Sequence, residues 1–151
     1  MNIYDRLLKF ATLRPRSEKE ILNWFKRKKI DSDLQKDLFN RLKHLNLVND
    51  LEFTRWWIEQ RNTFRPMGVR RLKVELALKG VDRTIIEKVL DEQIKPDEQK
   101  NYAKRLLSQK IDHHEKLDSL KVSKKAFEFL ARRGFDFGLI KEVIDEFNLK
   151  E

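Results

Sequence analysis

Apolar residues recur along the chain at spacings of one, three and four, which are typical of amphipathic helices. Three such stripes each follow an aspartate, namely Asp31, Asp82 and Asp136. Superposing these aspartates aligns two sets of apolar positions: Leu34, Ile85 and Leu139, and then Leu38, Val89 and Val143. The offsets between the aspartates are 51 and 54 residues. The pattern therefore predicts an internal repeat of about fifty residues.

Two further helical segments precede each stripe. The segments just before the aspartates are residues 17–28, 68–79 and 123–133, and those before them are residues 3–13, 51–61 and 98–109. Four glycines and three prolines leave little room for the turns of a β-rich fold. We predict an all-α chain of about nine helices in tandem three-helix repeats, with the repeats at 1–50, 51–97 and 98–151.

A short joint links the second and third helices of each repeat. It reads KGVD at residues 79–82, RGFD at 133–136 and KKID at 28–31. A terminal cation suits the negative end of a helix dipole, a left-handed glycine ends the helix, and the aspartate can cap the next one. Lys29 takes the glycine position of the first joint, so that turn either differs or is strained.

The middle repeat carries two features that bear on packing. Val69, Leu72 and Leu76 form one apolar strip of the 68–79 helix, and Val74, Ala77 and Leu78 form a second strip on its opposite side. This arrangement predicts a helix packed between two layers. With Phe53, the pair Trp56–Trp57 is expected to place one indole in the core and the other at a seam between repeats, or as a stacking platform for a base.

The composition restricts the function. The 151 residues carry a net charge of +9 and no cysteine, which excludes disulfides and thiol catalysis and is compatible with the cytosol. No apolar run approaches the roughly 18 residues of a membrane span, and the N-terminus has no apolar signal region. We therefore expect a cytoplasmic protein whose partner is a polyanion or an acidic protein surface.

Motifs for catalysis or cofactor binding are nearly absent. The chain has neither a GxxxxGK[ST] loop nor a GxGxxG motif, and the adjacent His113 and His114 make a poor chelate. Ser17 and Ser123 suit helix caps, and Ser17 with Glu20 forms a capping box rather than a nucleophilic site. The polar stretch 108–124 is the expected loop. We predict no enzyme activity, no cofactor and no metal.

Positive charge is concentrated in three places. Residues 61–79 contain six basic residues against Glu75 alone, and further clusters lie at Lys26–Lys29 and at Arg132–Arg133. Arginine suits bidentate pairing with phosphate or carboxylate. For the last two clusters, complementing helix dipoles is an equally good explanation. The candidate contact residues are Arg61, Arg65, Arg70, Arg71, Lys73, Arg132 and Arg133.

Four stretches in order resemble the RecX family of bacterial regulators of the RecA recombinase: RPRSEKEIL (14–22), LVNDLEFTRWWIEQR (47–61), MGVRRLKVELALKGVD (67–82) and FLARRGFDFGLIKEVI (129–144). The resemblance implies tandem three-helix repeats in an elongated, curved array with right-angled turns. It also implies a protein, expected to be a monomer, that lies in the groove of a RecA–single-stranded DNA filament. There it would restrain filament growth, ATP hydrolysis and strand exchange. Lys29 departs from the glycine common at that joint.

An autonomous helix-turn-helix-like DNA-binding module is the alternative. Such modules usually dimerise and read bases with one recognition helix. Here the basic residues lie on joints and second helices, which weakens this reading. For the RecX-like protein, binding to single-stranded DNA, and more weakly to duplex DNA, is expected through the basic surface.

Overall fold

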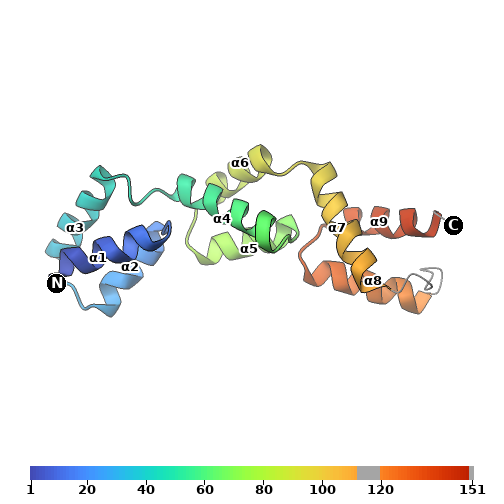
Figure 1. Ribbon diagram of the computed structural model, residues 1–151, viewed down its shortest axis with the longest axis horizontal. Coiled ribbons are helices and arrows are strands. Elements are labelled where there is room, and N and C mark those ends of the chain that lie inside the picture. The colour runs from blue at the N-terminus through green and yellow to red at the C-terminus, as the bar shows by residue number, and fades with distance from the viewer. Residues whose placement is uncertain (112–119, 150–151) are drawn as a thin grey trace. The chain divides into compact units, whose positions relative to one another are not determined.

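The computed structural model describes residues 1–111 and 120–149, and in these ranges it contains nine helices and no strand (Figure 1). The helices are α1 (Ile3–Leu13), α2 (Glu18–Arg27), α3 (Ser32–His44), α4 (Asp50–Phe64), α5 (Val69–Leu78), α6 (Arg83–Gln93), α7 (Pro96–Lys110), α8 (Leu120–Arg132) and α9 (Phe137–Leu149). The predicted all-α succession of three-helix repeats is confirmed. The repeat limits at 50/51 and 97/98 stay a prediction.

The chain divides into two compact units, Met1–Glu59 with Leu76–Val89, and Gln60–Glu75 with Leu90–Glu151. In the first unit, α1, α2 and α3 bury a core of Leu7, Ala11, Ile21, Trp24, Phe25, Leu38 and Leu42. In the second unit, α7, α8 and α9 bury a core of Ala103, Leu107, Ala126, Leu130, Phe135, Ile140, Val143 and Ile144. Of the aligned apolar positions, Leu38 and Val143 belong to these cores, whereas Leu34 is 36% exposed.

All three joints share one hydrogen-bonding pattern. The amide after the left-handed residue donates to a carbonyl five residues earlier: Ile30 to Phe25, Val81 to Leu76 and Phe135 to Leu130, at 3.1, 3.1 and 3.2 Å. This is the Schellman arrangement, which satisfies carbonyls that a helix end leaves free. Each aspartate then accepts from an amide of the next helix: Asp31 from Leu34, Asp82 from Thr84 and Asp136 from Gly138.

Lys29 adopts the left-handed conformation that the joint requires, with φ of 54°. The equivalent Gly80 and Gly134 have φ of 81° and 88°. The first joint therefore keeps its geometry and carries the strain of a side chain in that region, roughly 1–2 kcal/mol. The Lys29 side chain is exposed.

Three sequence expectations about packing are wrong. Val74 and Leu78 are 60% and 69% exposed, so α5 is not covered on both sides; periodicity marks an apolar face but does not show that another element covers it. Neither indole lies in the core as expected: Trp56 and Trp57 are both half-buried, whereas Phe53 is buried. Ser123 lies inside α8 rather than at its cap, because the helical pattern already begins at Leu120.

The predicted capping box at the start of α2 is present. Ser17 accepts from the Glu20 amide, and the Glu20 carboxylate accepts from the Ser17 amide at 3.1 Å. The predicted 108–124 loop is shorter than expected, since α7 continues through Lys110 and α8 begins at Leu120. Residues 112–119, which include His113 and His114, lie outside the described residues.

Candidate polyanion interface

The start of α5 docks onto the third joint, and this contact assembles the candidate site. The Gly68 amide donates to the Arg133 carbonyl at 2.8 Å, and the Arg70 amide donates to the Gly134 carbonyl at 2.9 Å. A Cβ on Gly68 would lie 2.1 Å from the Gly134 carbonyl carbon, and a Cβ on Gly134 would lie 2.3 Å from the Arg71 Cβ. Both glycines are therefore required for the close approach of two backbones.

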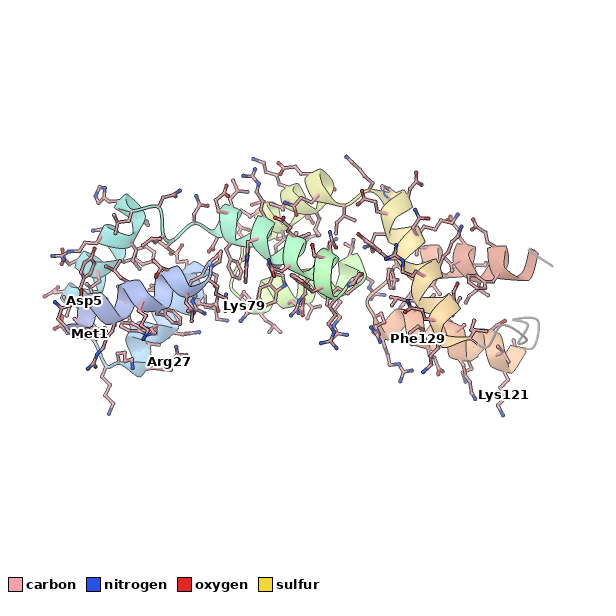
Figure 2. The ribbon with its side chains drawn as sticks, viewed as in Figure 1. Met1, Asp5, Arg27, Lys79, Lys121 and Phe129 are labelled. Carbon is pink, nitrogen blue, oxygen red and sulfur yellow. The ribbon has the colours of Figure 1, made fainter. Side chains whose placement is uncertain are left out.

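This docking brings Arg70 and Arg71 beside Arg132 and Arg133, from segments about sixty residues apart in the sequence. The Arg70 guanidinium lies 4.3 Å from the centroid of the Phe137 ring, and that of Arg133 lies 5.3 Å from the Phe129 ring. Figure 2 labels Phe129 on α8. The rings hold the flat guanidinium groups at the protein surface. We call these four residues the arginine cluster.

The arginine cluster carries uncompensated charge. Within the described ranges, none of its four members forms an ion pair with a carboxylate. Arg70 and Arg132 are exposed, and Arg71 and Arg133 are half-buried. Guanidinium groups placed in this way retain free N–H donors for an external anion.

The other predicted contact residues are placed differently. Arg61 forms a bidentate ion pair with Glu75, with N–O distances of 3.1 and 2.9 Å, so its guanidinium links α4 to α5. Arg65 and Lys73 are exposed. Lys73 lies three residues after Arg70 and therefore on the same side of α5. Arg65 lies near the loop that leads into α5.

Gln99 on α7 is a positioning residue that the sequence analysis missed. Its side chain is 5% exposed, accepts from the Val69 amide at 3.0 Å and donates to the Met67 carbonyl at 3.2 Å. It thus fixes the backbone on both sides of Gly68. A single glutamine in a polar helical segment carries no pattern that would reveal this role.

The start of α2 makes the equivalent contact with the second joint. The Ser17 hydroxyl donates to the Lys79 carbonyl at 2.8 Å, and the Lys19 ammonium donates to the Leu78 carbonyl at 3.2 Å (Figure 2 labels Lys79). Ser17 corresponds to Gly68 at the offset of 51 residues, and Lys79 corresponds to Arg133 at the offset of 54 residues. In both compact units, therefore, the carbonyl of the first joint residue accepts a hydrogen bond from the start of the second helix of the preceding repeat.

The charges around this second contact are compensated. Glu20 pairs with Arg14 and lies 3.5 Å from the Lys79 ammonium. Burial raises the pKa of Glu20, but hydrogen bonds from Arg14 and the Ser17 amide outweigh burial and leave the pKa below its ordinary value. The position that corresponds to Glu20 is Arg71, so the contact at the third joint has an arginine where the contact at the second joint has a carboxylate.

The described residues also bear on two other kinds of site, for metals and for membranes. No cluster of three or more histidine, cysteine, aspartate or glutamate side chains in those ranges is suited to hold a metal ion. None of the described helices has the length and apolar character needed to cross a membrane.

Comparison with known proteins gives concordant matches. Residues 49–90 match the second three-helix domain of RecX, and residues 97–144 match the third. Regulatory protein RecX of Chlorobium phaeobacteroides (strain BS1) is 31% identical over 144 residues, covering 95% of this chain and 91% of that protein. Regulatory protein RecX of Oceanobacillus iheyensis is 30% identical over 98% of this chain, which spans only 54% of that relative's length.

A solved structure shares the fold. The crystal structure of RecX from Lactobacillus salivarius matches with a TM-score of 0.82 and 23% identity. The match covers 97% of this chain and 94% of that one. The relatives are named as regulatory proteins.

Proposed function

Because this chain belongs to the RecX family of regulatory proteins, we propose that it is a non-enzymatic inhibitor of the RecA recombinase. One observation supports the proposal most directly: the hydrogen bonds from Gly68 to Arg133 and from Arg70 to Gly134 join the two segments that carry the arginine cluster, whose members have no carboxylate partner among the described residues. A nucleoprotein filament presents both phosphates and acidic side chains, and guanidinium groups pair with either.

In the proposed mechanism, the protein enters the groove of the RecA–single-stranded DNA filament as a monomer in the cytoplasm. The arginine cluster binds phosphate oxygens or acidic RecA side chains, with Arg65 and Lys73 adding charge beside it. By bridging adjacent RecA subunits, the bound protein alters their spacing and slows ATP hydrolysis, filament extension and strand exchange. Each step uses binding alone and requires no catalytic residue or cofactor of this chain.

The first test measures ATP hydrolysis by RecA on single-stranded DNA while this protein is titrated in below one molecule per RecA. We expect a fall in rate at ratios well below one, because a bridging inhibitor acts on the filament. Simple competition for DNA needs far more protein. An unchanged rate, even with excess protein at low salt, would contradict the proposal and favour an autonomous DNA-binding module.

The second test assigns the site. Arg70→Glu combined with Arg71→Glu should abolish inhibition while leaving the helical content unchanged, since both side chains keep the Cβ that packs at the joint. The matched control is Arg6→Glu with Lys9→Glu, which makes the same charge change on two exposed residues of α1. Full inhibition by the Arg70/Arg71 variant, or equal loss in the control, would exclude the arginine cluster as the contact surface.

A further inference from the structure

The first compact unit contains a cavity that the proposed function does not use. Its volume is about 470 Å³, within the range of roughly 300–1,000 Å³ that small-molecule sites occupy. It lies between the corner joining α1 to α2, the corner joining α3 to α4, and α4 itself. The lining residues used below are Arg14, Arg16, Asn46, Asn49 and Trp56.

Arg16 is the most unusual of these residues because it is a charged side chain only 9% exposed. Its Nε donates to the Phe10 carbonyl at 2.8 Å, and its guanidinium lies 3.8 Å from the centroid of the Phe10 ring. Its Nη1 and Nη2 atoms make no hydrogen bond or ion pair with any described residue. The protein thus fixes this guanidinium through one edge and leaves the other donors for a ligand.

No described carboxylate forms an ion pair with Arg16. The nearby Glu20 is engaged by Arg14 and Lys79, and Glu52 at the cavity wall pairs with Arg55 at 2.7 Å. Arginine stays protonated in proteins, and a buried charge is costly unless it is paired. An anionic ligand would supply the missing partner.

The rest of the cavity offers flat and polar surfaces. Trp56 is half-buried, and the Arg14 guanidinium lies 5.5 Å from its ring centroid. Indole rings and guanidinium planes are the surfaces on which unpaired nucleobases stack. The Asn49 Oδ1 accepts from the Leu51 and Glu52 backbone amides, which leaves the side-chain nitrogen of Asn49 as a donor. The side-chain amide of the exposed Asn46 bonds to no described residue. Amides of this kind pair with base edges.

We propose that this cavity binds one nucleotide unit of single-stranded nucleic acid, with a phosphate on the Nη atoms of Arg16 and the base stacked against Trp56. A duplex is a poor occupant because its bases are stacked and paired and cannot reach the indole. The proposal concerns this chain's own contact with a single strand and does not depend on action at a RecA filament.

The experiment uses the full chain labelled with 5-fluorotryptophan, which gives one fluorine resonance for each of Trp24, Trp56 and Trp57. A twelve-residue oligothymidylate is titrated in, and an abasic strand of the same length serves as the second probe. We expect the Trp56 resonance to shift with the thymidylate strand and to move little with the abasic strand. A Trp56 resonance that stays unmoved at saturation would overturn the proposal.

Substitutions test the phosphate contact. Arg16→Gln should weaken binding of the thymidylate strand about tenfold or more, and Arg6→Gln should not, although it removes the same charge. Arg16→Lys should restore part of the affinity, because lysine retains the positive charge that an anion site requires. A residue with only a packing role would show no such recovery. Circular dichroism confirms the fold of each variant. Unchanged affinity in a folded Arg16→Gln would refute the phosphate contact. A polyglutamate peptide that shifts Trp56 as strongly as DNA would instead assign the cavity to an acidic peptide.

Discussion

The Gln99 side chain accepts a 3.0 Å hydrogen bond from the Val69 backbone amide and thereby holds the first turn of α5 against α7. The amide of an N-terminal helical turn has no partner within its own helix. Gln99 supplies that partner from the next repeat and uses its own NH2 group on the Met67 carbonyl. The orientation of Arg70 and Arg71 therefore depends on a residue thirty positions away.

Gln99→Ala should reduce stability by about 1–3 kcal/mol, because two buried backbone groups lose their partner. Urea denaturation followed by circular dichroism measures the change. Gln109→Ala is the control, since Gln109 is exposed at the other end of α7. Equal effects of the two substitutions would show that the Gln99 bonds contribute nothing specific.

Gly134→Ala should loosen the contact between α5 and the third joint. The φ of 88° strains any side chain, and the new Cβ would meet the Arg71 backbone nitrogen at 2.6 Å. We expect a loss of stability of about 2 kcal/mol or more and faster hydrogen exchange of the Gly68 and Arg70 amides. Gly138→Ala, at an exposed helical glycine, should leave exchange at those two amides as it is. Protection of both amides in Gly134→Ala would contradict the packing described here.

Lys29→Gly should stabilise the protein by up to about 1 kcal/mol, because it relieves left-handed strain at the first joint. The greater flexibility of glycine in the unfolded chain offsets part of the gain. The midpoint of thermal unfolding measures the difference, and Lys28→Gly, at a residue in the ordinary right-handed region, should be destabilising. A destabilised Lys29→Gly would mean that Lys29 makes a compensating interaction.

Acid should weaken the third repeat through Glu146. Hydrogen bonds from Lys100 and then Lys104 lower the pKa of Glu146 from 4.5 to about 2. A carboxyl group whose pKa is lower in the folded state stabilises the fold above pH 4.5, and this contribution disappears as the pH falls towards 2. Glu146→Gln should therefore lose less stability than the unsubstituted protein across this range.

The measurement for Glu146 is urea denaturation at a series of pH values and low salt, since salt screens exposed ion pairs. Glu128→Gln is the matched control, because Glu128 is exposed on α8 and forms no ion pair with a described residue. Its stability should follow the same pH dependence as the unsubstituted protein. Identical profiles for all three proteins would rule out the Glu146 contribution.

The sequence predicted the fold well where the physics is local. The period of the apolar residues placed the helices, and the chemistry of lysine, glycine and aspartate predicted how the joints end one helix and begin the next. Even the capping box of Ser17 and Glu20 was evident, because both partners lie within one helical turn.

The site was less predictable because it depends on contacts between distant residues. Nothing in the sequence indicates that Glu75 engages Arg61, or that Gln99 reaches the amide of Val69. The exposed Val74 and Leu78 show that burial, too, depends on distant residues. An apolar strip indicates that a face can be buried, whereas burial also requires a neighbouring element of suitable shape. Clustered arginines were predicted, but the contact that unites Arg70–Arg71 with Arg132–Arg133 was not.

The contact between a helix start and the following joint has a direction. Among the described residues, the start of the second helix in the first and second repeats contacts the joint of the repeat that follows it in sequence, so the two surfaces that meet are unlike. Head-to-tail contacts of this kind do not close on themselves by symmetry. The number of repeats is therefore open to change by duplication: a copy inserted between the second and third repeats would find a matching partner on both sides.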